Sequence, residues 1–125
     1  MTYGCDISSV QEIIPLRRMT RLPGAPTYVR GLINMRGTIV TVLDLGVRLD
    51  PSRAIAPEGS IMLVRHDDRL VGVVVDEVLD VRTLDIDAGG LAESAGAIVR
   101  GVASVDGSAV VVLALDAMVS QVLLS

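Results

Sequence analysis

Short apolar stretches separated by turn-forming residues run along the chain, and this pattern predicts strands rather than long helices. Apolar and polar residues interleave over residues 5–14, and the prolines of residues 15–26 exclude a long helix there. The stretches 31–34 and 38–45 then flank a bend at Met35-Arg36-Gly37. A glycine at such a bend supplies the positive φ of a tight hairpin, so the pattern predicts a hairpin here.

The following stretches predict a second set of strands. Residues 61–65 and 70–81 predict a strand, a charged turn and a long strand. Residues 98–105 and 109–115 predict another hairpin, because the Asp-Gly pair between them is the strongest short hairpin signal in the chain. The chain is therefore expected to be all-β.

The remaining segments predict loops and one helix. Residues 50–60 have the Pro, Ser and Gly content of a surface loop, and residues 85–97 predict a loop with a short helical turn. Residues 116–125 predict a short amphipathic C-terminal helix, with Asp116 as its N-cap.

The hairpin signal occurs twice. The stretch YVRGLINMRGTIVTVLDL (28–45) returns as IVRGVASVDGSAVVVLAL (98–115), and a shift of 70 positions aligns eight identical residues. Upstream, VQEIIPLR (10–17) matches VDEVLDVR (75–82) at an offset of 65. The longer second repeat accommodates its insertion in the expected loop, where insertions are best tolerated.

The repeat predicts two small β modules in one domain of residues 1–125. We expect a first subunit at about residues 1–50 and a second at about residues 60–125, sharing an apolar interface and each closed into a barrel that hides its strand edges. The alternative is a single β-sandwich with a shared hairpin signature. A strand equivalent to residues 61–65 is missing before VQEII, so the first barrel is expected to have an open edge that favours self-association.

Composition narrows the classes of function. Half of the 125 residues are apolar, yet Phe and Trp are absent, so Val, Leu, Ile and Ala must form the core. No apolar run approaches the roughly 20 residues that cross a bilayer, and the N-terminus does not resemble a signal peptide. We therefore expect a cytoplasmic protein without membrane insertion, in which the lone Cys5 is a small buried hydrophobe.

Charge and residue types argue against nucleic-acid binding and catalysis. The net charge is −4 and only two residues are aromatic, which is unfavourable for binding phosphates and stacking bases. One His and one Cys cannot build a usual zinc site, there is no G-x-S-x-G motif, and without Lys a P-loop is excluded. We expect a binding module without enzymatic activity or cofactor.

One charge pair is predicted in the first repeat only. Glu12 recurs as Glu77, whereas Arg36 at the first hairpin bend is replaced by Asp106 at the second. If bend and strand approach each other within a repeat, the first repeat holds an Arg–Glu pair and the second holds two acids. The alternative is that Arg36 is a solvated turn residue.

These residues resemble the CheW-like family, the adaptor domain of bacterial chemotaxis arrays. The resemblance covers essentially the whole chain: VQEII, TRLPGAPTYVRGLINMRGTIVTVLDL with its N-[LM]-R-G turn, and VGVVVDEVLDV. It implies two packed, pseudo-repeated, SH3-like five-stranded β-barrels. Members usually carry a further apolar strand before the equivalent of YGCDI, so the first barrel here is expected to lack its N-terminal strand.

The resemblance also implies a function. Family members couple the cytoplasmic tip of a chemoreceptor, a helical hairpin, to the regulatory domain of the histidine kinase CheA, with the receptor tip expected in the groove between barrels. The positions that match the family's coupling residues are Val10, Glu12, Gly31, Arg36 and, more weakly, Gly72. The alternatives are an adaptor of a non-flagellar motility or receptor-kinase pathway, a self-assembling β-barrel scaffold, and an enzyme with an unrecognised site.

Overall fold

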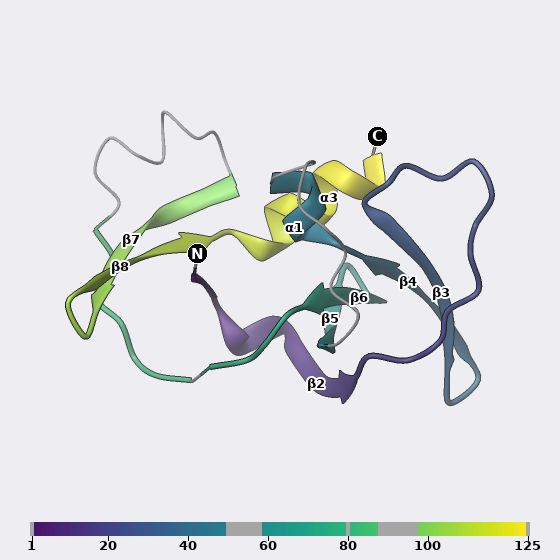
Figure 1. Ribbon diagram of the computed structural model, residues 1–125, viewed down its shortest axis with the longest axis horizontal. Helices are drawn as coiled ribbons and strands as arrows, with labels where there is room; N and C mark the ends of the chain where they lie inside the picture. Colours follow the sequence, from purple (N-terminus) through teal and green to yellow (C-terminus); the bar gives the residue numbers. More distant parts are fainter. Residues whose placement is uncertain (1, 50–58, 80, 88–97, 125) are drawn as a thin grey trace. The chain divides into compact units, whose positions relative to one another are not determined.

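The computed structural model describes residues 2–49, 59–79, 81–87 and 98–124 (Figure 1). The chain divides into two compact units. We call residues 9–79 the central unit and residues 1–8 with 80–125 the terminal unit. Most of the two expected loops, residues 50–58 and 88–97, lies outside the described residues.

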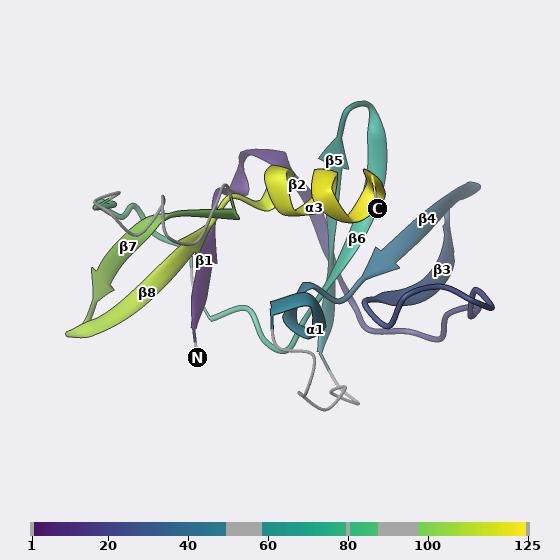
Figure 2. The same ribbon diagram turned by 90° about the horizontal axis from the view of Figure 1, so that it is seen from above.

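The central unit is built on a five-stranded sheet with the order β2-β5-β6-β4-β3 (Figure 2). Neighbouring strands are antiparallel except β4 and β6, which are parallel. The short helix α1 follows β4 directly. The elements of this unit are β2 (Val10–Pro15), β3 (Val29–Met35), β4 (Thr38–Leu43), α1 (Leu45–Leu49), β5 (Ser60–His66) and β6 (Arg69–Val75).

The terminal unit joins the two ends of the sequence in a three-stranded sheet with the order β1-β8-β7. β1 (Tyr3–Cys5) pairs in parallel with β8 (Ser108–Leu113), which pairs antiparallel with β7 (Val99–Val105). Helix α3 (Leu115–Leu124) follows β8, and the 3-10 helix η1 (Ile7–Ser9) follows β1.

The predicted subunit boundary between residues 50 and 60 is not the boundary of these units. β5 and β6 were expected to begin the second subunit, but they pair with β2 and β4 of the first. Parallel strands cannot be joined by a tight turn, so the 44–68 connection, which contains β5, brings β6 beside β4. The predicted subunits therefore exchange strands: β5 and β6 belong to the central unit, and β1 belongs to the terminal unit.

The prediction that each unit closes into a barrel is also wrong. β2 and β3 are the two edges of the central sheet and do not pair as strands, and the terminal sheet has three strands among the described residues. The prolines between β2 and β3 lack the N–H groups that strand pairing needs, and only an isolated bridge joins Thr20 to Leu32 of β3. The all-β character, the two sheets and the short C-terminal helix agree with the sequence.

The two predicted hairpins are confirmed and have the same register. Pairing shifts by one residue between Val29 and Gly31 in β3, and between Val99 and Gly101 in β7. At the first bend, φ is 51° at Arg36 and 88° at Gly37. The corresponding values at the second bend are 50° and 83°, as a two-residue turn with two positive φ angles requires. The hairpin that is repeated in the sequence is thus also repeated in the structure.

Three local boundaries differ from the sequence expectation. The long strand of residues 70–81 ends at Val75, since residues 76–79 and 81–86 form no strand. Helix α3 begins at Leu115, which places Asp116 inside its first turn rather than at the N-cap. Helix α1 was not predicted, because its five residues are too few to show a helical period.

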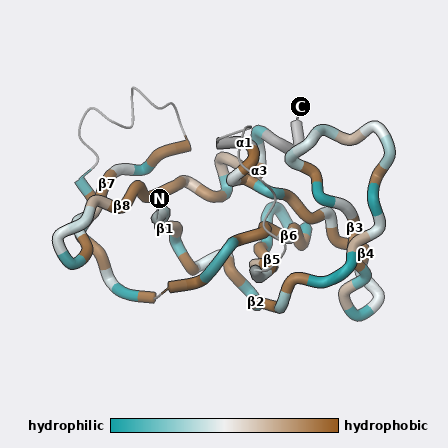
Figure 3. The backbone as a smooth tube through the Cα atoms, viewed as in Figure 1, coloured by the Kyte–Doolittle hydropathy of each residue, from teal (hydrophilic) through white to brown (hydrophobic). Residues whose placement is uncertain are grey.

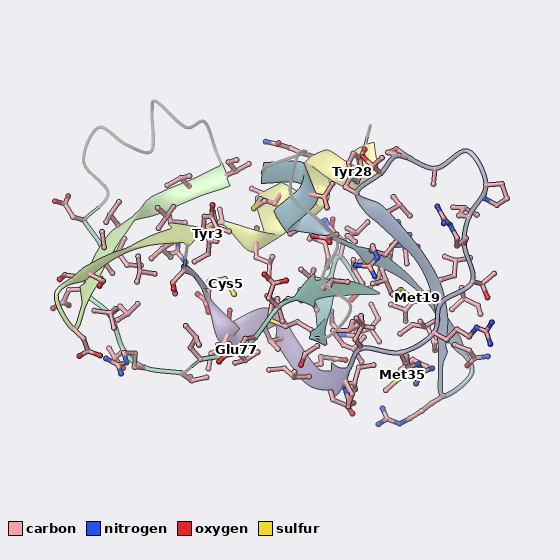
Figure 4. All side chains as sticks on the ribbon, in the orientation of Figure 1. Tyr3, Cys5, Met19, Tyr28, Met35 and Glu77 are labelled. Carbon is pink, nitrogen blue, oxygen red and sulfur yellow. The ribbon has the colours of Figure 1, made fainter. Side chains whose placement is uncertain are left out.

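Aliphatic side chains fill the core of the central unit. Val40 and Val42 of β4 and Ile61 of β5 are fully buried, and apolar positions follow the strands in Figure 3. Met35 belongs to the same cluster, and Met19 from the β2–β3 connection packs against it (both labelled in Figure 4). The connection therefore helps to cover a core that strand pairing leaves open.

No helix in the described part of the chain is long and apolar enough to cross a membrane.

Candidate partner-binding site

An exposed ion pair joins the two edges of the central sheet. The Arg36 guanidinium donates from Nη1 to Glu12 Oε1 and from Nη2 to Glu12 Oε2, both at 3.1 Å. Glu12 lies on edge strand β2, and Arg36 lies at the tip of the β3–β4 hairpin that forms the other edge. The side chains are 39% and 71% exposed, so the predicted pair is confirmed and faces solvent.

The hairpin bend is shaped to present Arg36 to β2. Arg36 itself has a positive φ, and the Asn34 side-chain Oδ1 accepts a hydrogen bond of 2.8 Å from the Gly37 backbone N–H. The Arg17 guanidinium donates to the backbone carbonyl of Asn34, which ties the residues after β2 to the same bend. Arg17 and Asn34 were not predicted as site residues from the sequence, although the N-[LM]-R-G turn contains the asparagine.

Gly31 acts through the backbone rather than as a surface contact. It is buried with φ of 149°, and a Cβ built on it would lie 2.5 Å from the Thr20 carbonyl oxygen. That close approach lets Thr20 exchange two backbone hydrogen bonds with Leu32, of 2.9 and 2.8 Å. Gly31 therefore positions the β2–β3 connection against β3.

The other two candidate residues lie at different depths. Val10 begins β2 opposite Val64 and is half-buried, beside an irregularity in pairing that precedes Glu12. Gly72 is buried in the middle of the sheet, paired with Val42 on one side and Leu63 on the other. A partner cannot touch Gly72 directly, so any influence of this position passes through the packing of the sheet.

Two exposed isoleucines lie on the strands next to the ion pair. Ile13 follows Glu12 on β2, and Ile39 lies on β4 opposite Asn34. Exposed apolar side chains favour contact with a protein partner, but Ile13 directly follows Glu12 on β2, so these two side chains point to opposite faces of the sheet.

The ion pair predicts a measurable change at acidic pH. Hydrogen bonding from Arg36, with a smaller contribution from its charge, holds the pKa of the Glu12 carboxyl below its ordinary value of 4.5, against a partial opposing effect of desolvation. A folded-state pKa below the unfolded one stabilises the fold above pH about 4.5, and this contribution is lost as the pH falls through the folded pKa. We expect Arg36→Gln to raise the pKa of Glu12, as measured by NMR titration of its side-chain carboxyl carbon.

The matched control for that titration is Arg100→Gln. Arg100 forms an exposed pair with Asp6, with 3.4 Å between Nη1 and Oδ2, in the terminal unit. The Arg100→Gln variant removes the same charge without touching Glu12, so the pKa of Glu12 should be unchanged. An unchanged Glu12 pKa in Arg36→Gln would contradict the assignment of the shift to Arg36.

A different ion pair is buried at the end of the β3–β4 hairpin. Arg30 Nη1 lies 3.5 Å from Asp44 Oδ2, and the two side chains are only 15% and 3% exposed. The contact lacks hydrogen-bond geometry, because Arg30 Nη1 has no hydrogen-bond partner within the part of the chain that the structure describes. Asp44 Oδ1 accepts a hydrogen bond of 3.1 Å from the Val47 N–H and so caps α1.

The described residues contain no group of three or more His, Cys, Asp or Glu side chains that could hold a metal ion. Burial, with a smaller effect of Asp6, raises the pKa of the Cys5 thiol above its ordinary value. A raised pKa keeps the thiol protonated at neutral pH, and a protonated thiol is a poor nucleophile.

The structure defines a small, mostly β protein with two sheets and an exposed ion pair. The chain belongs to the CheW-like domain family, which it matches over residues 1–123. The family consists of non-catalytic adaptors. The resemblance stated from the sequence is confirmed.

The known proteins that it is similar to include two relatives compared by sequence and one protein of solved structure. It is 39% identical over 83 residues to chemotaxis protein CheW of Klebsiella aerogenes (66% of this chain, 50% of the relative). It is 33% identical over 89 residues to protein PilI of Pseudomonas aeruginosa (68% and 48%). The chain thus spans about half the length of these two relatives.

The solved structure supports the fold. The crystal structure of scaffolding protein TtCheW from Thermoanaerobacter tengcongensis matches with a TM-score of 0.77 at 28% identity. The match covers 93% of this chain and 79% of that one.

Proposed function

We propose that this protein is a chemotaxis adaptor that couples chemoreceptors to the histidine kinase CheA in the cytoplasm. The observation that carries the proposal is membership of the CheW-like family over residues 1–123. The similarity to chemotaxis protein CheW and to a scaffolding protein of the same kind supports it. The partners are the regulatory domain of the kinase and the cytoplasmic tip of the receptor.

The proposed contact on the central unit is the surface around the ion pair. Arg36 and Glu12 provide exposed charges that can fix the orientation of a partner, and Ile39 on β4 provides exposed apolar area. Gly31 holds the connection that supports this surface, while Val10 lies at the start of the same strand. Gly72 contributes only through the packing of the sheet.

Charge reversal at the bend tests this surface. We expect Arg36→Glu to weaken binding of the kinase regulatory domain at least tenfold, because it places a second acid beside Glu12 and removes the guanidinium from the contact surface. Isothermal titration calorimetry measures the affinity, and a heteronuclear NMR spectrum confirms that the variant remains folded.

Arg100→Glu is the matched control for charge reversal. Arg100 is an exposed arginine in a similar carboxylate pair, but it belongs to the terminal unit. The Arg100→Glu variant should bind the kinase domain with the same affinity as the parent chain. If both variants bind normally, the Arg36 surface is not the contact; if the parent chain binds no kinase domain and forms concentration-dependent oligomers instead, self-assembly replaces the adaptor function.

The similarity to PilI favours a second candidate, the same adaptor function in a non-flagellar motility pathway. The two candidates differ in which kinase is the partner. Titration with the regulatory domains of both kinds of kinase from the source organism distinguishes them, since the chain should bind its own pathway's domain at least tenfold more tightly.

A further inference from the structure

The backbone groups of β3 point alternately toward β4 and away from it. Met35 and Thr38 are the paired residues that close the bend between the two strands. In an antiparallel hairpin, residues that bond across to the partner strand alternate with residues whose N–H and C=O groups point outward. Leu32 and Asn34 therefore face outward, and the two backbone hydrogen bonds between Leu32 and Thr20 agree with this.

A side chain takes over where backbone pairing on this outer edge stops. The antiparallel bridge between Thr20 and Leu32 is isolated, so the β2–β3 connection does not pair with β3 as a strand beyond it. Two residues farther along β3, the outward carbonyl of Asn34 accepts a hydrogen bond from the Arg17 guanidinium. The Arg17 side chain thus donates where the next N–H of a paired strand would donate.

This hydrogen bond fixes the backbone of the bend more directly than the ion pair does. Arg36 and Glu12 have long side chains that face solvent, and such exposed pairs hold one geometry only weakly. Arg17 bonds to the main chain two residues before Arg36, and a charged donor makes a stronger hydrogen bond than a neutral one. The Asn34 side chain also accepts from the Gly37 N–H, so Arg17 bonds to a residue that braces the bend.

The same position of the repeat meets the bend in the terminal unit. The alignment of VQEIIPLR with VDEVLDVR places Arg82 at the position of Arg17. Arg82 Nη1 lies 3.7 Å from Oδ2 of Asp106, the residue that replaces Arg36 at the second bend. An arginine at this position thus contacts the turn end of the hairpin in both units.

The two arginines differ in what they leave exposed at the bend. In the terminal unit, the charge of Arg82 lies against the opposite charge of Asp106. In the central unit, Arg17 bonds to an uncharged carbonyl, and the Arg36 guanidinium meets Glu12 while 71% of its side chain stays exposed. Arg17 therefore anchors the first bend without neutralising the charge that this bend presents.

We propose that Arg17 is a positioning residue of the partner-binding surface: it holds the end of the β3–β4 hairpin where Arg36 meets Glu12, and so presents Arg36 to the partner. The second part of this proposal rests on the proposed adaptor function, and the first part does not. A purely structural residue would stabilise the chain without moving Arg36, whereas a direct contact would bind the partner independently of Arg36.

Titration of Glu12 in the full chain reports the position of Arg36. Hydrogen bonding from Arg36, followed by its charge, is what lowers the pKa of the Glu12 carboxyl. We expect Arg17→Gln to raise this pKa by about half as much as Arg36→Gln does, because the released bend carries its guanidinium away from Glu12. Arg17→Lys keeps a cationic donor and should restore most of the lowering. NMR of the side-chain carboxyl carbon measures each pKa.

Two controls remove the same charge elsewhere. Arg18→Gln removes it from the next residue, which is also exposed, and Arg82→Gln removes it from the equivalent position of the terminal unit. Both should leave the pKa of Glu12 unchanged. A rise in Arg18→Gln as large as that in Arg17→Gln would assign the effect to charge rather than position and overturn the proposal. An unchanged pKa of Glu12 in folded Arg17→Gln would do the same.

Binding of the kinase regulatory domain, measured by calorimetry, tests the second part. Arg17→Gln should weaken binding about fivefold in the parent chain and have no further effect in an Arg36→Gln chain, where no guanidinium is left to position. An equal loss in both chains would make Arg17 a direct contact, and no loss in either would remove it from the partner-binding surface. If the parent chain binds no kinase domain, the adaptor function fails, while the Glu12 titration still decides whether Arg17 positions Arg36.

Discussion

Replacing Asp44 by Ala is expected to lower the free energy of unfolding by about 3–5 kcal/mol, the range for breaking one side of a buried ion pair. The loss has two sources: Arg30 is left with a buried, uncompensated charge, and the Val47 N–H loses its cap. Urea unfolding followed by circular dichroism measures the change.

The second hairpin supplies the control for this variant. Ala114 occupies the position equivalent to Asp44, and its N–H donates to the Ile98 carbonyl at 2.8 Å just as Asp44 donates to Tyr28 at 2.7 Å. Alanine therefore fits the backbone, and the cost of Asp44→Ala comes from charge and capping. Adding Arg30→Met should recover part of the loss, while a double variant less stable than Asp44→Ala would contradict the ion-pair explanation.

Replacing Gly31 by Val should destabilise the fold by about 3 kcal/mol or more. A non-glycine residue at this φ is strained by about 1–3 kcal/mol, and the new Cβ would collide with the backbone of Thr20 rather than with a movable side chain. We expect a lower urea midpoint and loss of exchange protection at the Thr20 and Leu32 amides, which are bonded to each other.

Gly37→Ala separates backbone strain from collision. Gly37 also has a positive φ, 88°, but a Cβ there would meet nothing within 4 Å. Gly37→Ala should lower the free energy of unfolding by only about 1 kcal/mol, the penalty of a left-handed conformation. A loss at Gly37→Ala as large as that at Gly31→Val would show that close approach to Thr20 is unimportant.

The hairpins were predictable because their signals are local. An apolar alternation and a glycine at the second position of each bend are enough to specify the turn and its register. The pairing of β6 beside β4 was not predictable, because it depends on contacts between residues that are distant in sequence. The strand expected to extend to residue 81 ends at Val75 because β5, its neighbour, extends only to the level of Ser60 there.

The ion pair of the candidate site was predictable because the two repeats differ at one of its residues. The replacement of Arg36 by Asp106 pointed to a pair with Glu12, and the geometry bears this out. Arg17 was missed because its partner is a backbone carbonyl, which no residue type reveals. The burial of Gly72 was missed because a glycine in a strand looks the same from sequence whether its neighbours are solvent or two other strands.

The segments of the chain that make up each unit set the order in which the two units can form during synthesis. The central unit is one continuous stretch, residues 9–79, so it can form as soon as that stretch leaves the ribosome. β1 is made before the central unit, but its partner β8 is made after it, since Tyr3 pairs with Val111. β1 must therefore stay without β8 until residues 108–113 have also left the ribosome.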